Sequence, residues 1–255
     1  EIEKQEIKGP SDNLIQIEIF AHGALCMAVS GKCYLSLHTT NSSANRGACI
    51  QNCRKTYTVT DTEDGHQFEI DNEYIMSAKD LCTIGFIDKV LDAGTRILKI
   101  EGRGRSPEYV KTTTQCYREA ADSYLKGTYN QTKVSEWMER LKTVYNRGFW
   151  DGYYLGQKLG EWSNIHGSKA TKKKIYLGKA KKYFTNLQVA EFNLETMQLN
   201  EGEDILITGR TTGVIETIAG EIRLNDKQVK VVKKGDNFSM KLAYIIRPSD
   251  KLYKV

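Results

Sequence analysis

The spacing of hydrophobic and polar positions predicts alternating strands and helices up to about residue 146. Apolar, β-branched runs at residues 14–20 and 96–101 are typical of strands. Apolar residues recur every three or four positions over 77–91, from Ser106 onwards and over 132–145, where one face carries Val134, Trp137, Leu141 and Val144. Strand, loop and helix repeated in this way predict a parallel sheet.

A polar stretch interrupts this alternation. Residues 36–48 are rich in Thr, Ser and Asn and are predicted to form a loop. Two short runs, 57–59 and 67–70, alternate on either side of Asp64 and Gly65, which indicates a hairpin, and a brief strand is expected at 74–76.

Short β runs replace the helical spacing after Gly148. Turn residues separate seven of them, at residues 175–177, 188–192, 204–208, 214–217, 228–232, 238–243 and 251–255. Short strands of this kind predict a small closed β-barrel. The whole pattern therefore predicts an α/β domain over 1–146 and an all-β domain over 147–255.

Composition and charge describe an ordinary globular chain. The 255 residues are 40% hydrophobic and 27% charged, with a formal net charge of +5. That mild excess fits RNA or another polyanion without requiring one. No apolar run approaches the roughly 20 residues that span a membrane, and no secretory leader is evident, so a cytoplasmic protein is expected. Because residue 1 is Glu rather than Met, we expect the C-terminal portion of a longer protein.

Four of the six cysteines lie in one stretch, at Cys26, Cys33, Cys49 and Cys53. Four thiolates suffice for a 4Fe–4S cluster or a zinc site. Their spacing lacks the Cys-x-x-Cys pairs of zinc ribbons, which favours iron and leaves zinc as the second choice. The alternatives are a disulfide pair, rare in the cytosol, and buried reduced thiols. Cys82 and Cys116 fall in helical patterns, and we expect them to pack in the core.

His22 and Glu18 are the candidate catalytic residues. His22 follows the first predicted strand, at a turn with Gly23, where it could act as an acid, a base or an anion ligand. A local hydrogen bond is the alternative. Glu18 places a carboxylate inside an apolar strand, so catalysis and a salt bridge to a neighbouring strand are both open.

Fixed cations accompany these residues in two places. Arg46 and Arg54 are interleaved with the second pair of cysteines. The strand at 96–101 and the turn before the Ser106 helix carry Lys99, Glu101, Arg103 and Arg105. Cations and the backbone N–H groups of a helix start would form an anion pocket for carboxylate or phosphate, with Arg103 the preferred ligand. The alternatives are an ion pair between Lys99 and Glu101 and a solvated Arg105.

The β-rich half begins with a basic segment. Lysines and aromatic residues are interspersed there, at Lys172, Lys173, Lys174, Tyr176, Lys179, Lys181, Lys182, Tyr183 and Phe184. Such a strand could hold an RNA backbone and stack bases. The alternative is a solvated edge strand that lysines protect from aggregation.

The cysteine-containing stretch also resembles a known family. Ten positions are similar to the signature of the U32 collagenase-like peptidase family, namely Glu18, Phe20, Gly23, Ala24, Leu25, Cys26, Gly31, Cys33, Leu35 and Ser36. The resemblance continues through residues 45–49, 77–82, 99–103 and 146–149. It implies a TIM-type (β/α) barrel, of which residues 1–146 supply the last three strands, and a C-terminal β-barrel domain. An upstream half of the barrel, or a partner chain, would then cover the open sheet edge.

The same resemblance implies a function. The better-understood bacterial members look like tRNA-modifying proteins that hydroxylate C5 of the wobble uridine with prephenate. An iron–sulfur cluster, tRNA, and prephenate or a similar dicarboxylate are therefore the expected cofactor and partners. Proteolysis, the family's historical label, is the alternative; it needs an activated nucleophile, for which Cys26 with His22 is a conceivable pair. A non-catalytic fragment is a third alternative.

Overall fold

The computed structural model describes residues 1–26, 28, 32–70, 77–165 and 167–255. They form two compact units, one of Glu1–Arg105 with Thr112–Ala170 and one of Ser106–Lys111 with Thr171–Val255. The hydrophobic pattern placed the change at residue 146. The first unit extends further because β6 (Phe149–Trp150) pairs with its strand β4 (Asp80–Cys82).

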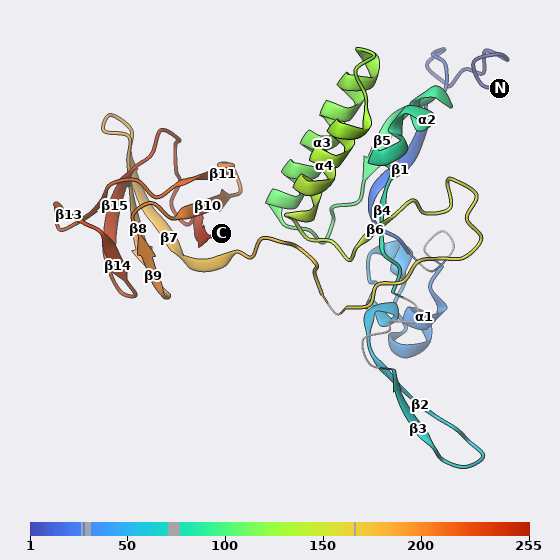
Figure 1. Ribbon diagram of the computed structural model, residues 1–255, viewed down its shortest axis with the longest axis horizontal. Helices are drawn as coiled ribbons and strands as arrows, with labels where there is room; N and C mark the ends of the chain where they lie inside the picture. The colour runs from blue at the N-terminus through green and yellow to red at the C-terminus, as the bar shows by residue number, and fades with distance from the viewer. Residues whose placement is uncertain (27, 29–31, 71–76, 166) are drawn as a thin grey trace. The chain divides into compact units, whose positions relative to one another are not determined.

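The first unit is built on a four-stranded sheet in the order β5-β1-β4-β6 (Figure 1). β1 (Ile17–Ala24) runs parallel to β5 (Thr95–Ile100) and antiparallel to β4, and β4 runs parallel to β6. The prediction of a purely parallel sheet is therefore wrong. The segment between β1 and β4 contains a hairpin as well as a short helix at Tyr34–Thr40, so it is not the simple helical crossover that imposes a parallel direction. The (β/α) barrel itself stays a prediction.

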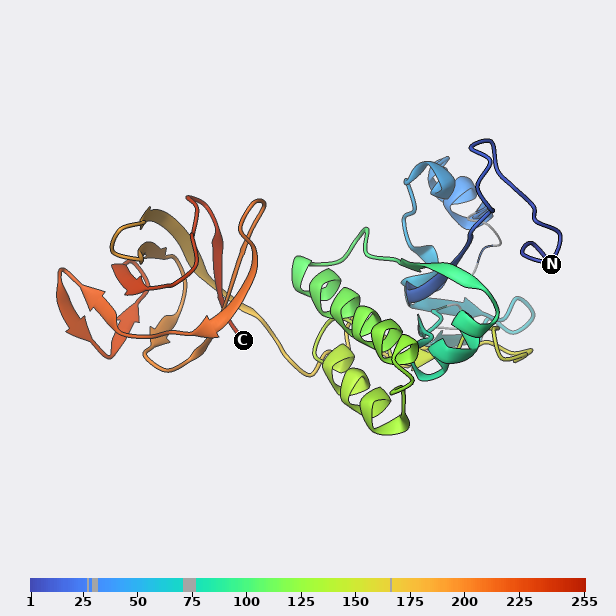
Figure 2. The same ribbon diagram turned by 90° about the horizontal axis from the view of Figure 1, so that it is seen from above.

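Two helices pack on this sheet, α3 (Pro107–Leu125) and α4 (Gln131–Lys142), and they lie side by side (Figure 2). The side chain of Asn130 caps α4 by accepting a hydrogen bond from the Lys133 backbone N–H. The apolar stripe of α4 is buried in one core with Cys82 and Cys116. This confirms both predicted helices and the packing role of the two cysteines. No helix among the described residues has the length and apolar character that a membrane crossing demands.

The helix predicted over 77–91 is wrong in its first half. Residues Asp80–Cys82 form β4, which is buried along its whole length between β1 and β6. A 3-10 turn, η4 (Ile84–Phe86), and the helix α2 (Ile87–Asp92) follow. A short apolar run has no periodicity that separates a buried strand from a helix, and tertiary pairing decided the outcome.

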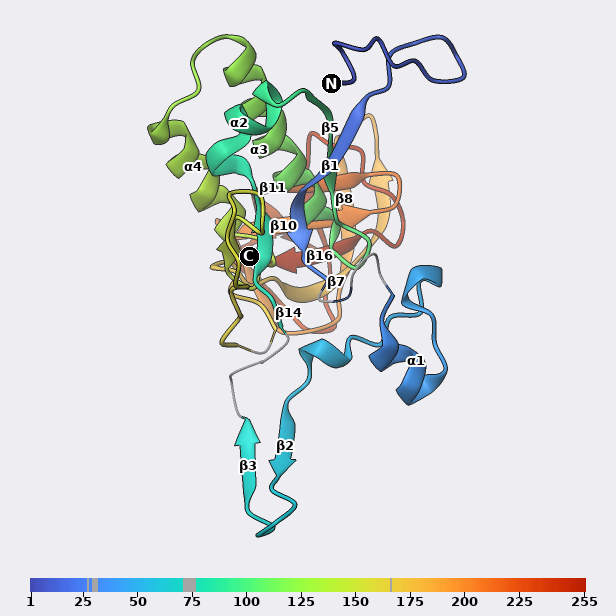
Figure 3. The same ribbon diagram turned by 90° about the vertical axis from the view of Figure 1, so that its right-hand side faces the viewer.

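The predicted loop at 36–48 begins as a helix, α1 (Tyr34–Thr40), followed by η2 (Ala44–Arg46). The hydroxyls of Thr39 and Thr40 donate to the carbonyls of Leu35 and Ser36, so polar side chains typical of loops are accommodated inside the helix. The hairpin prediction is confirmed: β2 (Tyr57–Thr60) and β3 (Gln67–Ile70) pair and project from the unit (Figure 3). The strand predicted at 74–76 lies outside the described residues.

The second unit is antiparallel. Its strands are β7 (Ile175–Phe184), β8 (Val189–Leu194), β9 (Gln198–Asn200), β10 (Asp204–Gly209), β11 (Gly213–Ile218), β12 (Ile222–Leu224), β13 (Lys227–Val229), β14 (Val231–Lys233), β15 (Asn237–Lys241) and β16 (Lys251–Lys254). Eight of them form one sheet in the order β11-β10-β16-β7-β8-β15-β12-β13, which curls around a core centred on Phe192 and Phe238 (Figure 2). The all-β half is confirmed as a large antiparallel sheet, and its closure into a barrel stays a prediction.

Candidate functional site

The four cysteines of residues 26–53 lie in one segment of the first unit. All four are free thiols; Cys26 and Cys49 are exposed, and Cys33 and Cys53 are partly buried. Burial raises the pKa of Cys53, the charge of Arg54 lowers it, and Cys49, Cys26 and Cys33 each raise it further. Charges influence one another well beyond the length of a metal–sulfur bond, so these influences define no ligand geometry.

Three residues in the left-handed backbone conformation turn the chain within residues 41–51. Asn41 ends α1, Gly47 ends η2, and Gln51 precedes η3 (Asn52–Arg54), each with a φ between 50° and 88°. Asn and Gly adopt this conformation readily, and each such residue changes the direction of the chain. The polar composition of residues 36–48, from which a loop was predicted, therefore produces a series of short turns.

The donor set fits an iron–sulfur cluster or a zinc ion, since both accept four cysteine thiolates. Across the described ranges, however, no three His, Cys, Asp or Glu side chains are arranged to hold one metal ion. The metal centre therefore stays a prediction.

Arg54 ties the cysteine segment to the sheet. Its Nη1 donates to Ser77 Oγ at 2.7 Å and to the Ala78 carbonyl at 2.6 Å, and its Nη2 donates to the Leu25 carbonyl at 3.0 Å. The sequence suggested an anion ligand. The structure instead places the guanidinium group against neutral acceptors of the chain itself.

Two other arginines meet on a single buried carboxylate. Arg105 Nη2 lies 3.5 Å and Arg147 Nη1 lies 3.3 Å from the Asp80 oxygens, and Asp80 is 1% exposed. Both guanidinium groups also face the ring of Tyr145, at 4.0 and 5.1 Å from its centroid. The alternative of a solvated Arg105 is therefore wrong. Sequence reasoning missed this cluster, although the motifs at 77–82 and 146–149 contain Asp80 and Arg147.

The turn after β5 reaches the cysteine segment. Arg103 is exposed, and its Nη2 donates to the Gly47 carbonyl at 3.4 Å, next to the exposed Arg46. The backbone N–H of Arg103 donates to the Glu101 carboxylate at 3.2 Å. Arg103 thus contacts the residue that follows Arg46, and the anion pocket itself stays a prediction.

Lys99 and Glu18 form an ion pair of 2.8 Å between the adjacent strands β5 and β1, with both side chains about half exposed. This confirms the salt bridge proposed for Glu18. Lys99 also lies 5.1 Å from the ring centroid of Phe20. The pair belongs to the face of the sheet rather than to the cysteine segment.

His22 lies within β1 and is 1% exposed. The turn predicted at His22 and Gly23 is wrong, because both residues belong to β1 and their backbones pair with Cys82 and Leu81 of β4. The imidazole ring lies 5.5 Å from the rings of both Tyr117 and Phe149, and its Nδ1 is 3.4 Å from the Tyr117 hydroxyl. Burial, and then the charge of Arg105, lower the pKa of His22 to about 3, so the ring is neutral at neutral pH.

The lowered pKa of His22 predicts acid sensitivity. Below the ordinary value of 6.5 the unfolded chain binds a proton that the folded chain refuses until about pH 3, so stability falls as pH falls through this window. We expect a loss of about 2 kcal/mol between pH 7 and pH 5 from this residue. Urea unfolding at both pH values measures it. His22→Gln should abolish this contribution and the exposed His38→Gln should retain it; equal slopes in both variants would contradict the assignment.

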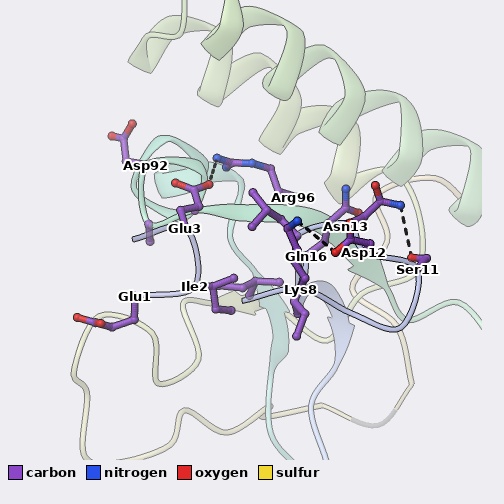
Figure 4. Close-up of a pocket in the computed structure, with 15 residues that line it drawn as sticks. Glu1, Ile2, Glu3, Lys8, Ser11, Asp12, Asn13, Gln16, Asp92 and Arg96 are labelled. Carbon is purple, nitrogen blue, oxygen red and sulfur yellow. Dashed lines mark hydrogen bonds and ion pairs between the residues drawn. The ribbon is translucent and has the colours of Figure 1, made fainter. Parts of the chain in front are cut away.

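A cavity of about 950 Å³ lies at the other end of β1, lined by residues 1–3, 8, 11–17, 92–94 and 96 (Figure 4). Its charged groups are paired across exposed contacts, Arg96 with Glu3 at 2.7 Å and Lys8 with Asp12 at 3.1 Å. It sits at the amino ends of the parallel strands β1 and β5, whereas ligands of α/β sheets bind at the carboxyl ends. We assign no function to it.

Comparisons with known proteins agree with the family resemblance of residues 18–36. The model of peptidase family U32 matches residues 1–164. A collagenase of Porphyromonas gingivalis is 56% identical over 99% of this chain, and the chain spans 61% of the length of that relative.

Two further relatives carry names from RNA modification. The tRNA hydroxylation protein P1 of Bacillus subtilis is 39% identical over 67% of this chain and 41% of its own length. A 23S rRNA 5-hydroxycytidine synthase of Escherichia coli is 35% identical over 57% of this chain and 23% of its own length. The family match covers well over half of the residues, and the relatives include both names that the motif implied. The chain therefore belongs to peptidase family U32.

Proposed function

We propose that the protein containing this chain takes part in prephenate-dependent 5-hydroxylation of the wobble uridine of tRNA, with an iron–sulfur cluster. The observation that carries the proposal is the presence of four free cysteines within residues 26–53, the number of thiolates that a cluster takes. Replacing C5–H by C5–OH is an oxidation that needs an external acceptor for two electrons, and a cluster held by Cys26, Cys33, Cys49 and Cys53 would supply the redox chemistry that links the base to that acceptor. Hydrolysis of a peptide bond has no such requirement.

The distribution of charge supports an RNA partner. Residues 171–255 contain 16 Lys and Arg against 10 Asp and Glu, a net charge of +6, whereas residues 1–170 contain 21 against 22, a net charge of −1. On β7, Lys182 lies 4.7 Å from the ring centroid of Phe184, and Lys179 pairs in register with Lys251 of β16. Clustered lysines neutralise phosphates, and aromatic rings beside them stack bases. Two RNA-hydroxylating names among the relatives point in the same direction.

The dicarboxylate would bind between exposed cations beside the cysteines. Arg103 contacts the segment at Gly47, and Arg46 is the preceding residue. Guanidinium groups present paired N–H donors that match a carboxylate, and two of them suit a ligand with two carboxylates. Lys99 and Glu101, at the end of β5 and just after it, would contribute one positive and one negative charge beside this turn. A further barrel half, upstream or in a partner chain, would complete the site.

Collagenase-type proteolysis is the second candidate, and the 56% identity to a relative of that name favours it. Cys26, exposed after β1, would be the nucleophile and His22 the base. A base works best when its pKa lies near the working pH, and that of His22 is lowered to about 3. Because the buried His22 would be a poor base at neutral pH, we place proteolysis second.

Nucleoside mass spectrometry of tRNA tests the proposal. In a strain that lacks the gene, 5-hydroxyuridine and its derivatives are expected to disappear and to return with the full-length wild-type protein. With Cys53→Ser, the 5-hydroxyuridine content should stay as low as in the deletion strain, because one cluster ligand is lost. Lys55→Gln, which changes the exposed cation two positions away, should restore the modification. Unchanged hydroxyuridine in the deletion strain would refute the proposal. Gelatin cleavage that requires Cys26, by purified protein without iron, would establish the second candidate instead.

A further inference from the structure

The short helix η3 (Asn52–Arg54) donates hydrogen bonds to the segments that adjoin Cys26 and Cys33. Its middle residue is Cys53 itself. Asn52, 5% exposed, donates from its side-chain amide to the Leu35 carbonyl at 3.2 Å and to Thr39 Oγ1 at 2.8 Å. Both acceptors belong to α1, the helix that Cys33 begins.

Arg54 makes the corresponding contacts on the other side. One of its three hydrogen bonds goes to the carbonyl of Leu25, the residue before Cys26, and two go to Ser77 and Ala78, which precede β4. A single guanidinium group thus joins its own segment to two stretches of chain that lie 29 and 23 positions from it in sequence. Hydrogen bonds from a charged donor are about twice as strong as neutral ones, and the planar fork fixes direction as well as distance.

From these contacts we infer that η3 assembles the thiol site, with Arg54 as the positioning residue for Cys26 and Cys53 and Asn52 as that for Cys33. This inference rests on the proposed function only for the identity of the bound metal. The arginine contributes no ligand; it sets the separation of Cys26 and Cys53 through the backbone. Groups that orient metal ligands in this way typically change metal affinity by about 10–100-fold when they are replaced.

The charge of Arg54 gives the same residue a second effect. Four thiolates around a divalent zinc or a 4Fe–4S core with charge +2 leave a net charge of −2. A guanidinium group in the residue next to one ligand offsets part of that negative charge. An Arg54→Lys variant distinguishes the geometric effect from the charge effect, because it keeps the positive charge and lacks the planar guanidinium group.

The experiment measures metal release from the full-length protein. After anaerobic loading with iron and sulfide, or with zinc alone, a chelator is added, and the loss of visible absorbance or of bound zinc is followed. We expect release to be about 10–100-fold faster in Arg54→Gln, with a smaller increase in Arg54→Lys. Lys55→Gln removes an equal charge from the neighbouring exposed residue and should release metal at the wild-type rate. Asn52→Ala should also accelerate release.

A second measurement needs no metal. The backbone N–H groups of Arg54 and Lys55 donate to the carbonyls of Gln51 and Asn52, so both amides should be protected from hydrogen exchange in the metal-free protein. Exchange at these amides should accelerate at least severalfold in Arg54→Gln and not in Lys55→Gln, while exchange in β10 stays the same. Wild-type exchange and wild-type metal release in Arg54→Gln would overturn the inference, as would faster exchange with unchanged release. If the wild-type protein binds no metal, the cluster of the proposed function fails, and exchange alone decides whether Arg54 positions the segment.

Discussion

Replacing Asp80 by Ala is expected to lower the free energy of unfolding of the first unit by about 3–5 kcal/mol. The substitution removes the carboxylate that the buried side chains of Arg105 and Arg147 share. It also removes the acceptor of the Arg147 backbone N–H, at 3.2 Å. Burying a guanidinium group without its counter-charge costs several kcal/mol, so this pair is among the most sensitive points of the unit.

Urea unfolding followed by tryptophan fluorescence measures this loss, because all three tryptophans, Trp137, Trp150 and Trp162, lie in the first unit. Asp12→Ala is the matched control. Asp12 also pairs with a cation, Lys8 at 3.1 Å, but its side chain is 86% exposed, and an exposed pair contributes about 0–1 kcal/mol. Equal unfolding midpoints for the two variants would show that the buried cluster adds nothing to stability.

The same cluster shows where sequence reasoning stops. Arg105, at a polar turn, was assigned either to an anion pocket or to the solvent, and the sequence offered no sign that Asp80 lies beside it. The ion pair joins positions 25 residues apart, and Arg147 is a further 42 residues away. Charge pattern identifies cations, but only the pairing of β4 with β1 and β6 decides which of them is buried.

Local signals were reliable where backbone and side chain agreed. The hairpin over β2 and β3, the helix that starts at Pro107 and the buried stripe of α4 follow from turn residues, a proline and a 3.6-residue spacing. The prediction failed at β4 because a buried strand of three residues is too short to show a hydrophobic periodicity. A shared metal site of Cys26, Cys33, Cys49 and Cys53 was predicted from their number and spacing and from the family resemblance, and it stays a prediction. The hydrogen bonds of Asn52 and Arg54 to neighbouring segments could be found only in the structure.

Phe192→Ala is expected to destabilise the second unit by about 3–5 kcal/mol and to leave the first unit unchanged. Phe192 is completely buried and stacks on Phe238 with ring centroids 5.6 Å apart, in a core separate from that of the first unit. Removing the ring opens a cavity that the paired strands β8 and β15 cannot close without losing register. The result should appear in far-UV circular dichroism as an earlier transition, with no shift in tryptophan fluorescence.

The functional consequences of Phe192→Ala should divide in the same way. If residues 171–255 bind RNA and residues 26–53 bind metal, the variant should lose tRNA affinity above its own transition temperature and keep the metal content of the wild-type protein. Leu187→Ala truncates a side chain that is 66% exposed and should change neither property. A fluorescence transition that moved together with the circular dichroism would mean that the two cores unfold as one, and loss of metal with it would place the thiol site under the control of the β-rich unit.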